Sequence, residues 1–206
     1  MCLRMTYCGS GRHAEIVAFT LFSLNQITAA AVIMLLLLLS IYDIITLVER
    51  GRIMEYTYKS PIGDIWISYD DTHILGLCFD RPQAADYKHN DIIDRCIKQL
   101  DEYFAAGRTD FDVPLNPMGT DFQQATWAAL RTIPYGQTTT YGQIAAQIGR
   151  AKAARAVGMV NNRNPIYIII PCHRVVGAGG KLVGYGGGLA RKEWLLKHEA
   201  SGRNEQ

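Results

Sequence analysis

The segment IPCHRVV, residues 170–176, places a thiol, an imidazole and a guanidinium on three consecutive residues. Cys172 is a nucleophile only as the thiolate, and apolar surroundings raise the pKa of a thiol, so a neighbouring base must take its proton. His173 is the candidate base, and Arg174 adds positive potential beside it. These residue types in this order predict nucleophilic chemistry at sulfur.

The residues around the thiol indicate where it lies and what supports the base. Residues 166–170 form a continuous apolar run that predicts a buried strand or extended segment, which Pro171 ends because it has no amide hydrogen. Adjacent side chains of an extended chain point to opposite sides, so we expect a water to link His173 with the sulfur. A histidine base also requires a carboxylate that fixes its tautomer. Glu199 is the candidate, and Glu193 is the alternative.

The five cysteines argue against a disulfide framework and against a structural zinc site. Their number is odd, and no pair has the spacing of zinc ligands, which favours a reducing compartment. Cys78 lies in an apolar strand-like run, and Cys96 lies on the apolar face of a predicted helix, so we expect both thiols in the core. We therefore expect no metal site in this chain.

Charge is unevenly distributed along the chain, although the net charge is only +2. Residues 54–121 contain 13 acidic and six basic residues, a net of −7. Residues 150–197 contain nine basic residues and one acidic residue, a net of +8. The basic half suits a polyanion such as nucleic acid. On charge alone, an ordinary solvated basic surface is an equal alternative.

The chain divides into three predicted segments. Residues 1–53 form a hydrophobic extension, in which residues 27–48 are marginal for a membrane span. Met54 opens a stretch typical of the start of a soluble domain. We therefore expect residues 1–53 to be translated from sequence upstream of the true start and to be absent from the native cytoplasmic protein. A membrane tether through residues 27–48 is the alternative. Residues 54–116 then form a small α/β domain, and residues 117–206 form a mainly helical domain.

The small domain shows two kinds of periodicity. Strand-like runs at 63–69 and 73–79 flank an Asp-Asp turn and predict a β-hairpin. Residues 91–104 have the periodicity of an amphipathic helix.

The second domain begins with a helix predicted over 122–133 and continues with two short helices, predicted over 141–148 and 151–162 and joined at Gly149. This pair is the pattern of a helix-turn-helix. Small residues dominate its second helix, and Arg155 is the long side chain among them. Such a helix either packs tightly inside a protein or lies close to a DNA backbone.

The segments KAARAVG, NP, IPCHRVV and GYGGGLARKEWLLKHE together resemble the O6-alkylguanine-DNA alkyltransferases, in the bacterial form without a zinc-binding front domain. The similarity runs at motif level from about Phe122 to Glu199 and more loosely from Met54. It implies a small antiparallel sheet with a helix, ribonuclease-H-like, followed by a helical domain with a winged helix-turn-helix.

The resemblance also implies a function. It is that of a methylated-DNA–protein-cysteine methyltransferase, which extrudes the damaged base and acts once per molecule. The expected partner is double-stranded DNA containing O6-alkylguanine, bound by a monomer without a cofactor, and O4-alkylthymine is a second candidate substrate. A DNA-binding regulator or damage sensor that uses the helix-turn-helix without turnover is the alternative function.

The same resemblance assigns roles to individual residues. It implies that Cys172 accepts the alkyl group, that His173 deprotonates it through a water, and that Glu199 supports the histidine. Tyr141 is similar to a tyrosine that donates a hydrogen bond to the extruded base, and Arg155 to an arginine that fills the gap in the base stack. The remaining implied positions are Ala154 and Gly158 for DNA contact, the hinge Asn164, and the pocket residues Val175, Tyr185 and Gly186.

Two positions depart from the family pattern. Some members have a serine or another side chain near Gly186 that can contact the guanine oxygen, whereas GYGGGLA offers only backbone amides there. Met159 is bulkier than the small residue often found after the glycine at 158. The first departure leaves the donor to the leaving oxygen unassigned.

Overall fold

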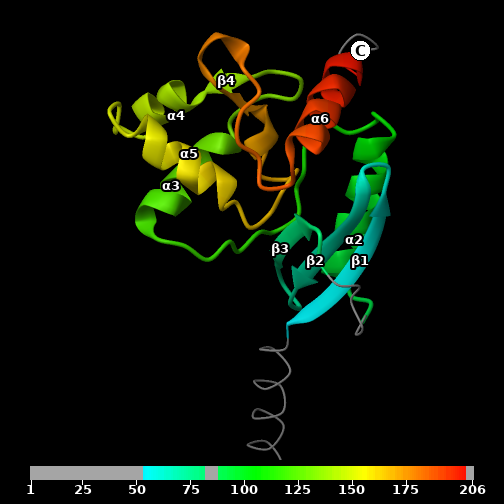
Figure 1. Cartoon of the computed structure of the whole chain (residues 1–206). Coiled ribbons are helices and arrows are strands. Elements are labelled where there is room, and N and C mark those ends of the chain that lie inside the picture. Colours follow the sequence, from blue (N-terminus) through cyan, green and yellow to red (C-terminus); the bar gives the residue numbers. More distant parts are fainter. Residues whose placement is uncertain (1–52, 82–87, 203–206) are drawn as a thin grey trace, which may run out of the picture. The chain divides into compact units, whose positions relative to one another are not determined.

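The computed structural model describes residues 53–81 and 88–202 (Figure 1). Residues 1–51 and 52–206 form two separate units, and the described residues belong to the second. The predicted extension, except Ile53, and the membrane segment considered at 27–48 lie outside the described residues. Within the described part of the chain, no helix combines the length and apolar character that crossing a bilayer requires.

The first half of the described chain contains a three-stranded antiparallel sheet, in the order β1 (Met54–Ser60), β2 (Gly63–Tyr69), β3 (Ile74–Phe79). The predicted hairpin is confirmed as β2 and β3. Its turn is stabilised by Asp70, whose carboxylate accepts hydrogen bonds from the backbone N–H groups of Thr72 and His73. β1 adds a strand that the residue pattern does not predict.

One helix, α2 (Asp91–Phe104), follows the sheet and confirms the predicted amphipathic helix. It begins at Asn90, whose side chain accepts hydrogen bonds from the N–H groups of Ile92 and Ile93. Its inner face buries Ile93, Cys96, Leu100 and Tyr103. Cys96 is therefore a core thiol as predicted, whereas Cys78 on β3 is only half-buried.

The second half is helical and contains α3 (Asp121–Leu130), α4 (Tyr141–Gln147), α5 (Ala154–Asn162) and α6 (Leu189–Gly202). Capping boxes open α3 at Thr120 and α4 at Thr140. Gly149 has φ +70 in the turn between α4 and α5, a conformation that glycine adopts without strain. α4, this turn and α5 form the predicted helix-turn-helix.

Two of these helices miss a predicted end by three residues, and α4 ends one residue early, at Gln147. α3 ends at Leu130, and the chain continues to Ile133 in a turn closed by the bond from Ile133 N to Leu130 O. α5 begins at Ala154, because Ala153 N donates to Arg150 O in a preceding turn and no side chain caps the helix earlier.

The apolar run before the cysteine is buried, but the prediction of a strand or extended segment is wrong. Leu77 of β3 exchanges backbone hydrogen bonds with Pro165 O and Tyr167 N, a single bridge after which the chain turns. Ile168 in this turn has φ 68, a strained conformation for a β-branched residue. Cys172–Arg174 then forms one 3₁₀ turn, and β5 (Val175–Val176) pairs in parallel with β4 (Thr139–Thr140).

Candidate active site and DNA interface

The candidate nucleophile, Cys172, is fully buried at the start of the 3₁₀ turn. Asn164 holds it there, because its Nδ2 donates to Cys172 Sγ at 2.9 Å and to Ile170 O at 2.8 Å. Asn161 Nδ2 donates to the carbonyl of Cys172 at 3.2 Å. Asn161 is in the last turn of α5 and Asn164 lies two residues beyond its end, so hydrogen bonds join the helix-turn-helix to the segment of the thiol. Asn164 was expected as a hinge, whereas no sequence signal indicated Asn161.

Burial dominates the electrostatics of the thiol and raises the pKa of Cys172 to about 11, against the opposing effects of the Asn164 hydrogen bond and the Lys192 charge. Lys192 is itself buried, and its ammonium donates to Val175 O at 2.6 Å and Val183 O at 2.8 Å. Burial lowers the pKa of Lys192 to about 8. The thiol therefore needs a local base at neutral pH, and Lys192 is a nearby cation that sequence reasoning missed.

His173 is positioned to be that base. Its Nε2 lies 2.8 Å from Oε1 of Glu199, and its Nδ1 forms no hydrogen bond with the described residues. A carboxylate accepts the hydrogen bond that Nε2–H donates, so the neutral ring has its proton on Nε2 and its free lone pair on Nδ1. Burial lowers the pKa of His173, although Glu199 opposes that shift, so the ring is neutral and able to take a proton. Among the hydrogen bonds of the described residues, none joins the His173 ring to the sulfur, as expected. The reason expected for this, an extended chain, is wrong, because the two residues lie in a 3₁₀ turn.

Glu199 is the centre of a buried polar network that joins both halves of the described chain. Besides the histidine, it accepts hydrogen bonds from Arg174 Nε at 2.9 Å, Tyr103 Oη at 2.8 Å and the backbone N–H of Gly136 at 3.1 Å. Burial alone would raise the pKa of this carboxyl, but His173 and Arg174 outweigh it and hold the pKa far below its usual range.

This network settles two points that the sequence left open. Arg174 neutralises Glu199 rather than facing the thiol, which corrects the expectation that it supplies positive potential there. The alternative carboxylate, Glu193, is on the surface, paired with Lys197. Tyr103 comes from α2, in a domain where the sequence showed no catalytic residues. A tyrosine on the buried face of a predicted helix was the available signal for it.

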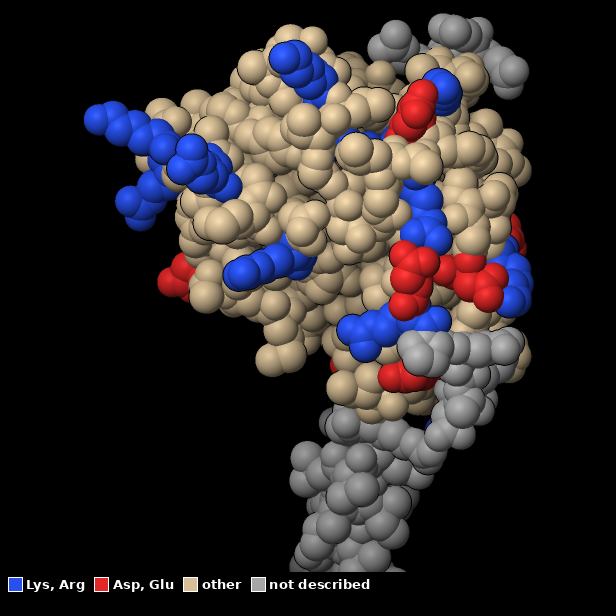
Figure 2. Space-filling view, viewed as in Figure 1, with Lys and Arg blue, Asp and Glu red and all other residues tan. Residues whose placement is uncertain are grey.

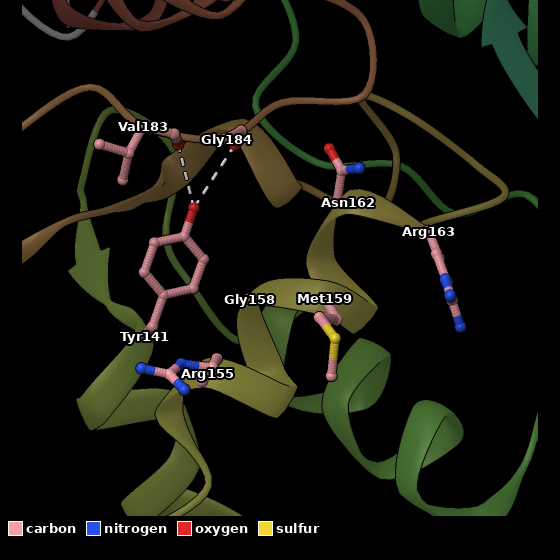
Figure 3. Close-up of a pocket in the computed structure, with 8 residues that line it drawn as sticks. All are labelled: Tyr141, Arg155, Gly158, Met159, Asn162, Arg163, Val183 and Gly184. Atoms are coloured by element: carbon pink, nitrogen blue, oxygen red, sulfur yellow. Dashed lines mark hydrogen bonds between the residues drawn. The ribbon is translucent and has the colours of Figure 1, made fainter.

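A cavity of about 430 Å³ lies between α5 and the loop that follows β5 (Figure 3). Tyr141, at the start of α4, spans this space and donates from its hydroxyl to Val183 O at 3.0 Å. Burial and the charge of Cys172 raise the pKa of both Tyr141 and Tyr185, so both phenols keep their protons at neutral pH. Val175 and Tyr185 are buried, and Gly186 is exposed. The Tyr141 phenol thus lies in the wall of the cavity, where it is a hydrogen-bond donor.

The outer side of α5 is exposed and basic. Arg155 and Met159 line the cavity and are solvent-exposed, while Ala154 and Gly158 are half-buried on the same helix. Figure 2 shows blue side chains projecting from the side formed by α3, α4 and α5, where red is sparse. No ion pair within the described residues involves the exposed basic side chains Arg131, Arg150, Lys152, Arg155, Arg163 and Lys181. Unpaired cations around a cavity are typical of a surface that binds phosphates.

Family comparisons match both halves of this architecture. Residues 53–117 match the ribonuclease-like domain of 6-O-methylguanine DNA methyltransferase, and residues 121–201 match the DNA-binding domain of the same family. The chain belongs to the 6-O-methylguanine DNA methyltransferase family. The three-stranded sheet and the helical domain are thus the fold that the sequence predicted, and DNA is the partner expected of this family.

Individual members of the methyltransferase family cover most of the described chain. A methylated-DNA–protein-cysteine methyltransferase of Mycobacterium leprae is 57% identical over 145 residues, 68% of this chain and 88% of the relative. One from Methanosarcina acetivorans is 48% identical over 150 residues, 70% of this chain and 96% of the relative. A solved structure of Mycobacterium tuberculosis OGT in complex with DNA is 47% identical, with a TM-score of 0.67, and covers 72% of this chain and 94% of that one.

Proposed function

We propose that this protein repairs DNA by moving an alkyl group from O6 of guanine to the sulfur of Cys172. The observation that carries the proposal is the joining of Cys172 to a His173–Glu199 pair on one side and to the end of α5 through Asn164 on the other. A nucleophile, a base oriented by a carboxylate and a DNA-binding helix are thereby held in one unit. The family assignment supports the same reaction.

The chemistry is a direct displacement at the alkyl carbon. The proton of the thiol passes to His173 Nδ1 through a water, the sulfur attacks the carbon, and the carbon–oxygen bond breaks with its electron pair remaining on guanine. Positioned proton transfer of this kind contributes about 10²- to 10⁴-fold to rate. The product is a thioether, which water does not readily hydrolyse. Each molecule therefore acts once, without a metal or organic cofactor.

The DNA-binding geometry follows from the exposed face of α5. A target atom inside duplex DNA is out of reach of a buried thiol, so the guanine must be extruded, at a cost of a few kcal/mol. Ala154 and Gly158 let the helix approach the DNA, and Arg155 fills the space the base has left. Tyr141 then exchanges its hydrogen bond with the loop carbonyls for one with the extruded base.

We place the small α/β domain at residues 54–116 and the alkyltransferase domain at residues 117–206.

Loss of the lesion from DNA tests this function. We expect the protein, mixed with excess duplex that contains O6-methylguanine, to remove the methyl group in a single burst equal to the amount of protein. Continued turnover after the burst would contradict the proposal. Release of the damaged guanine as a free base would contradict it too, because the base rather than the methyl group would then have left the DNA. Duplexes with O4-methylthymine, measured in parallel, give the substrate range.

Replacement of the α5 arginine tests base extrusion separately from chemistry. We expect Arg155→Ala to slow repair of duplex DNA about 10-fold, because the vacated stack is no longer filled and extrusion becomes less favourable. Reaction with free O6-methylguanine base should change less than about 2-fold, since no stack is opened. Arg150→Ala, which removes another exposed arginine of the basic surface, is the control. Equal losses on both substrates would show that Arg155 acts on chemistry or folding instead.

A further inference from the structure

Tyr167 lies five residues before Cys172, in the buried segment that leads to the candidate active site. Its backbone N–H donates to Leu77 O at 2.8 Å, which fixes the residue against β3. Its ring packs against Phe79 at 5.8 Å and Tyr185 at 5.4 Å between ring centroids. The ring is thus held from two sides, while the side chain as a whole is only half-buried.

The hydroxyl of Tyr167 occupies the space that a side chain at residue 186 would fill. A Cβ added to Gly186 would overlap the Tyr167 hydroxyl oxygen and would lie 3.0 Å from the ring carbon that bears it. The glycine at 186 is therefore matched to the tyrosine at 167. Residue 186 has no side chain that could donate a hydrogen bond, but the hydroxyl of Tyr167 occupies the place where such a side chain would begin.

This hydroxyl has no hydrogen-bond partner among residues 53–81 and 88–202, and Tyr167 belongs to the segment that leads into Cys172. Burial and then the charge of Cys172 raise the pKa of Tyr167 to about 12, so its hydroxyl keeps its proton at neutral pH. No hydrogen bond of the Tyr167 hydroxyl is formed with any described residue. A Cβ at Gly186 that overlaps this hydroxyl would also lie 2.9 Å from the carbonyl oxygen of Asn162, a residue that lines the cavity. A tyrosine hydroxyl is both donor and acceptor, so one at the edge of a cavity is available to a bound molecule.

We propose that the Tyr167 hydroxyl donates a hydrogen bond to the 6-oxygen of the extruded guanine as the alkyl group leaves it. The proposal rests on the alkyl transfer proposed above and adds the group that stabilises its leaving oxygen. As the sulfur–carbon bond forms and the carbon–oxygen bond breaks, the electron pair collects on that oxygen and the guanine ring. A donor already in place stabilises this charge without moving. Tyr167 keeps its own proton, and the guanine anion is protonated by water on release.

Removal of the one hydroxyl, with the ring retained, tests the proposal. We expect Tyr167→Phe to lower the first-order rate of methyl transfer from O6-methylguanine in duplex DNA about 10- to 100-fold, as expected for one hydrogen bond to a charged group. Affinity for the same DNA should be unchanged. With 6-methylthioguanine, whose leaving sulfur is a weak acceptor, the variant should react within about 2-fold of the wild-type rate.

Tyr69→Phe is the matched control, because it removes a phenol hydroxyl that donates to Lys88 O in the small domain. It should leave both rates unchanged. Equal rates for Tyr167→Phe and wild type on O6-methylguanine would overturn the role of Tyr167, and so would an equal slowing on both substrates. Failure of the wild-type protein to transfer methyl from either substrate would instead overturn the proposed function.

Discussion

Cys172→Ala is expected to lose alkyl transfer entirely, because no second thiol is in contact with the His173–Glu199 pair among the described residues. Binding to duplex DNA that contains O6-methylguanine should stay within about 3-fold of wild type, because the exposed cations that neutralise phosphates are untouched. Single-turnover repair and equilibrium binding, measured on the same duplex, separate the two effects.

Cys78→Ala is the matched control for this variant, because it removes a half-buried thiol on β3. It should repair DNA at the wild-type rate. Residual transfer in Cys172→Ala, above that of protein denatured beforehand, would contradict the assignment of the nucleophile. Wild-type protein that binds the lesion but never loses it from the DNA would favour the damage-sensor alternative.

Glu199→Gln is expected to cause the second large effect, on stability as well as on rate. The substitution removes the charge that pairs with Arg174 and leaves a buried guanidinium without a counter-ion. Breaking a buried ion pair in this way lowers the free energy of unfolding by about 3–5 kcal/mol. Repair should also slow about 100-fold, because the His173 tautomer is no longer fixed. Chemical denaturation and single-turnover kinetics measure the two losses.

The pH dependence of this variant separates Glu199 from a general loss of packing. The pKa of Glu199 is depressed in the folded protein, so its contribution to stability is full above its unfolded pKa of about 4.3 and is lost as pH falls below that value. The pKa of His173 is also lowered, so stability falls first below about pH 6.5, where the unfolded state takes up a proton that the folded state does not.

Wild-type stability should therefore fall in two steps on acidification, and the step near pH 4 should be smaller in Glu199→Gln. It should not vanish, because the pKa values of Asp70, Asp80 and Asp112 are also lowered. Glu193→Gln is the control, because it removes an exposed carboxylate paired with Lys197. An exposed pair of this kind contributes less than about 1 kcal/mol. If Glu199→Gln is as stable as Glu193→Gln at neutral pH, the network does not stabilise the protein as the structure indicates.

The sequence predicted the elements whose signals are local. The helix-turn-helix followed from Gly149 and the capping box at Thr140, and the hairpin of β2 and β3 followed from an Asp-Asp turn. The candidate nucleophile and base could also be predicted from the sequence, because the thiol of Cys172 and the imidazole of His173 are chemically distinctive in any fold. Their roles remain predictions that the experiments above test.

What could not be predicted depends on contacts between distant parts of the chain. The run at 166–170 has the composition of a strand, but Leu77 binds only its first residues, and the backbone then turns through Ile168. Tyr103 reaches Glu199 across 96 residues, and no local pattern shows which buried tyrosine has a charged partner. In the sequence, Lys192 resembles any charged residue on a surface helix. Only the structure shows that it is buried and donates to backbone carbonyls.

The central claim is that Cys172 receives the alkyl group, and peptide mass spectrometry of the protein after repair tests it most directly. Wild-type protein is mixed with duplex DNA that has an isotopically labelled methyl group on O6 of guanine, and is then digested. We predict one labelled methyl group per chain, on the peptide that contains Cys172, with none on the peptides of Cys78 or Cys96. Label on another residue, or repaired DNA with no label on the protein, would contradict the account.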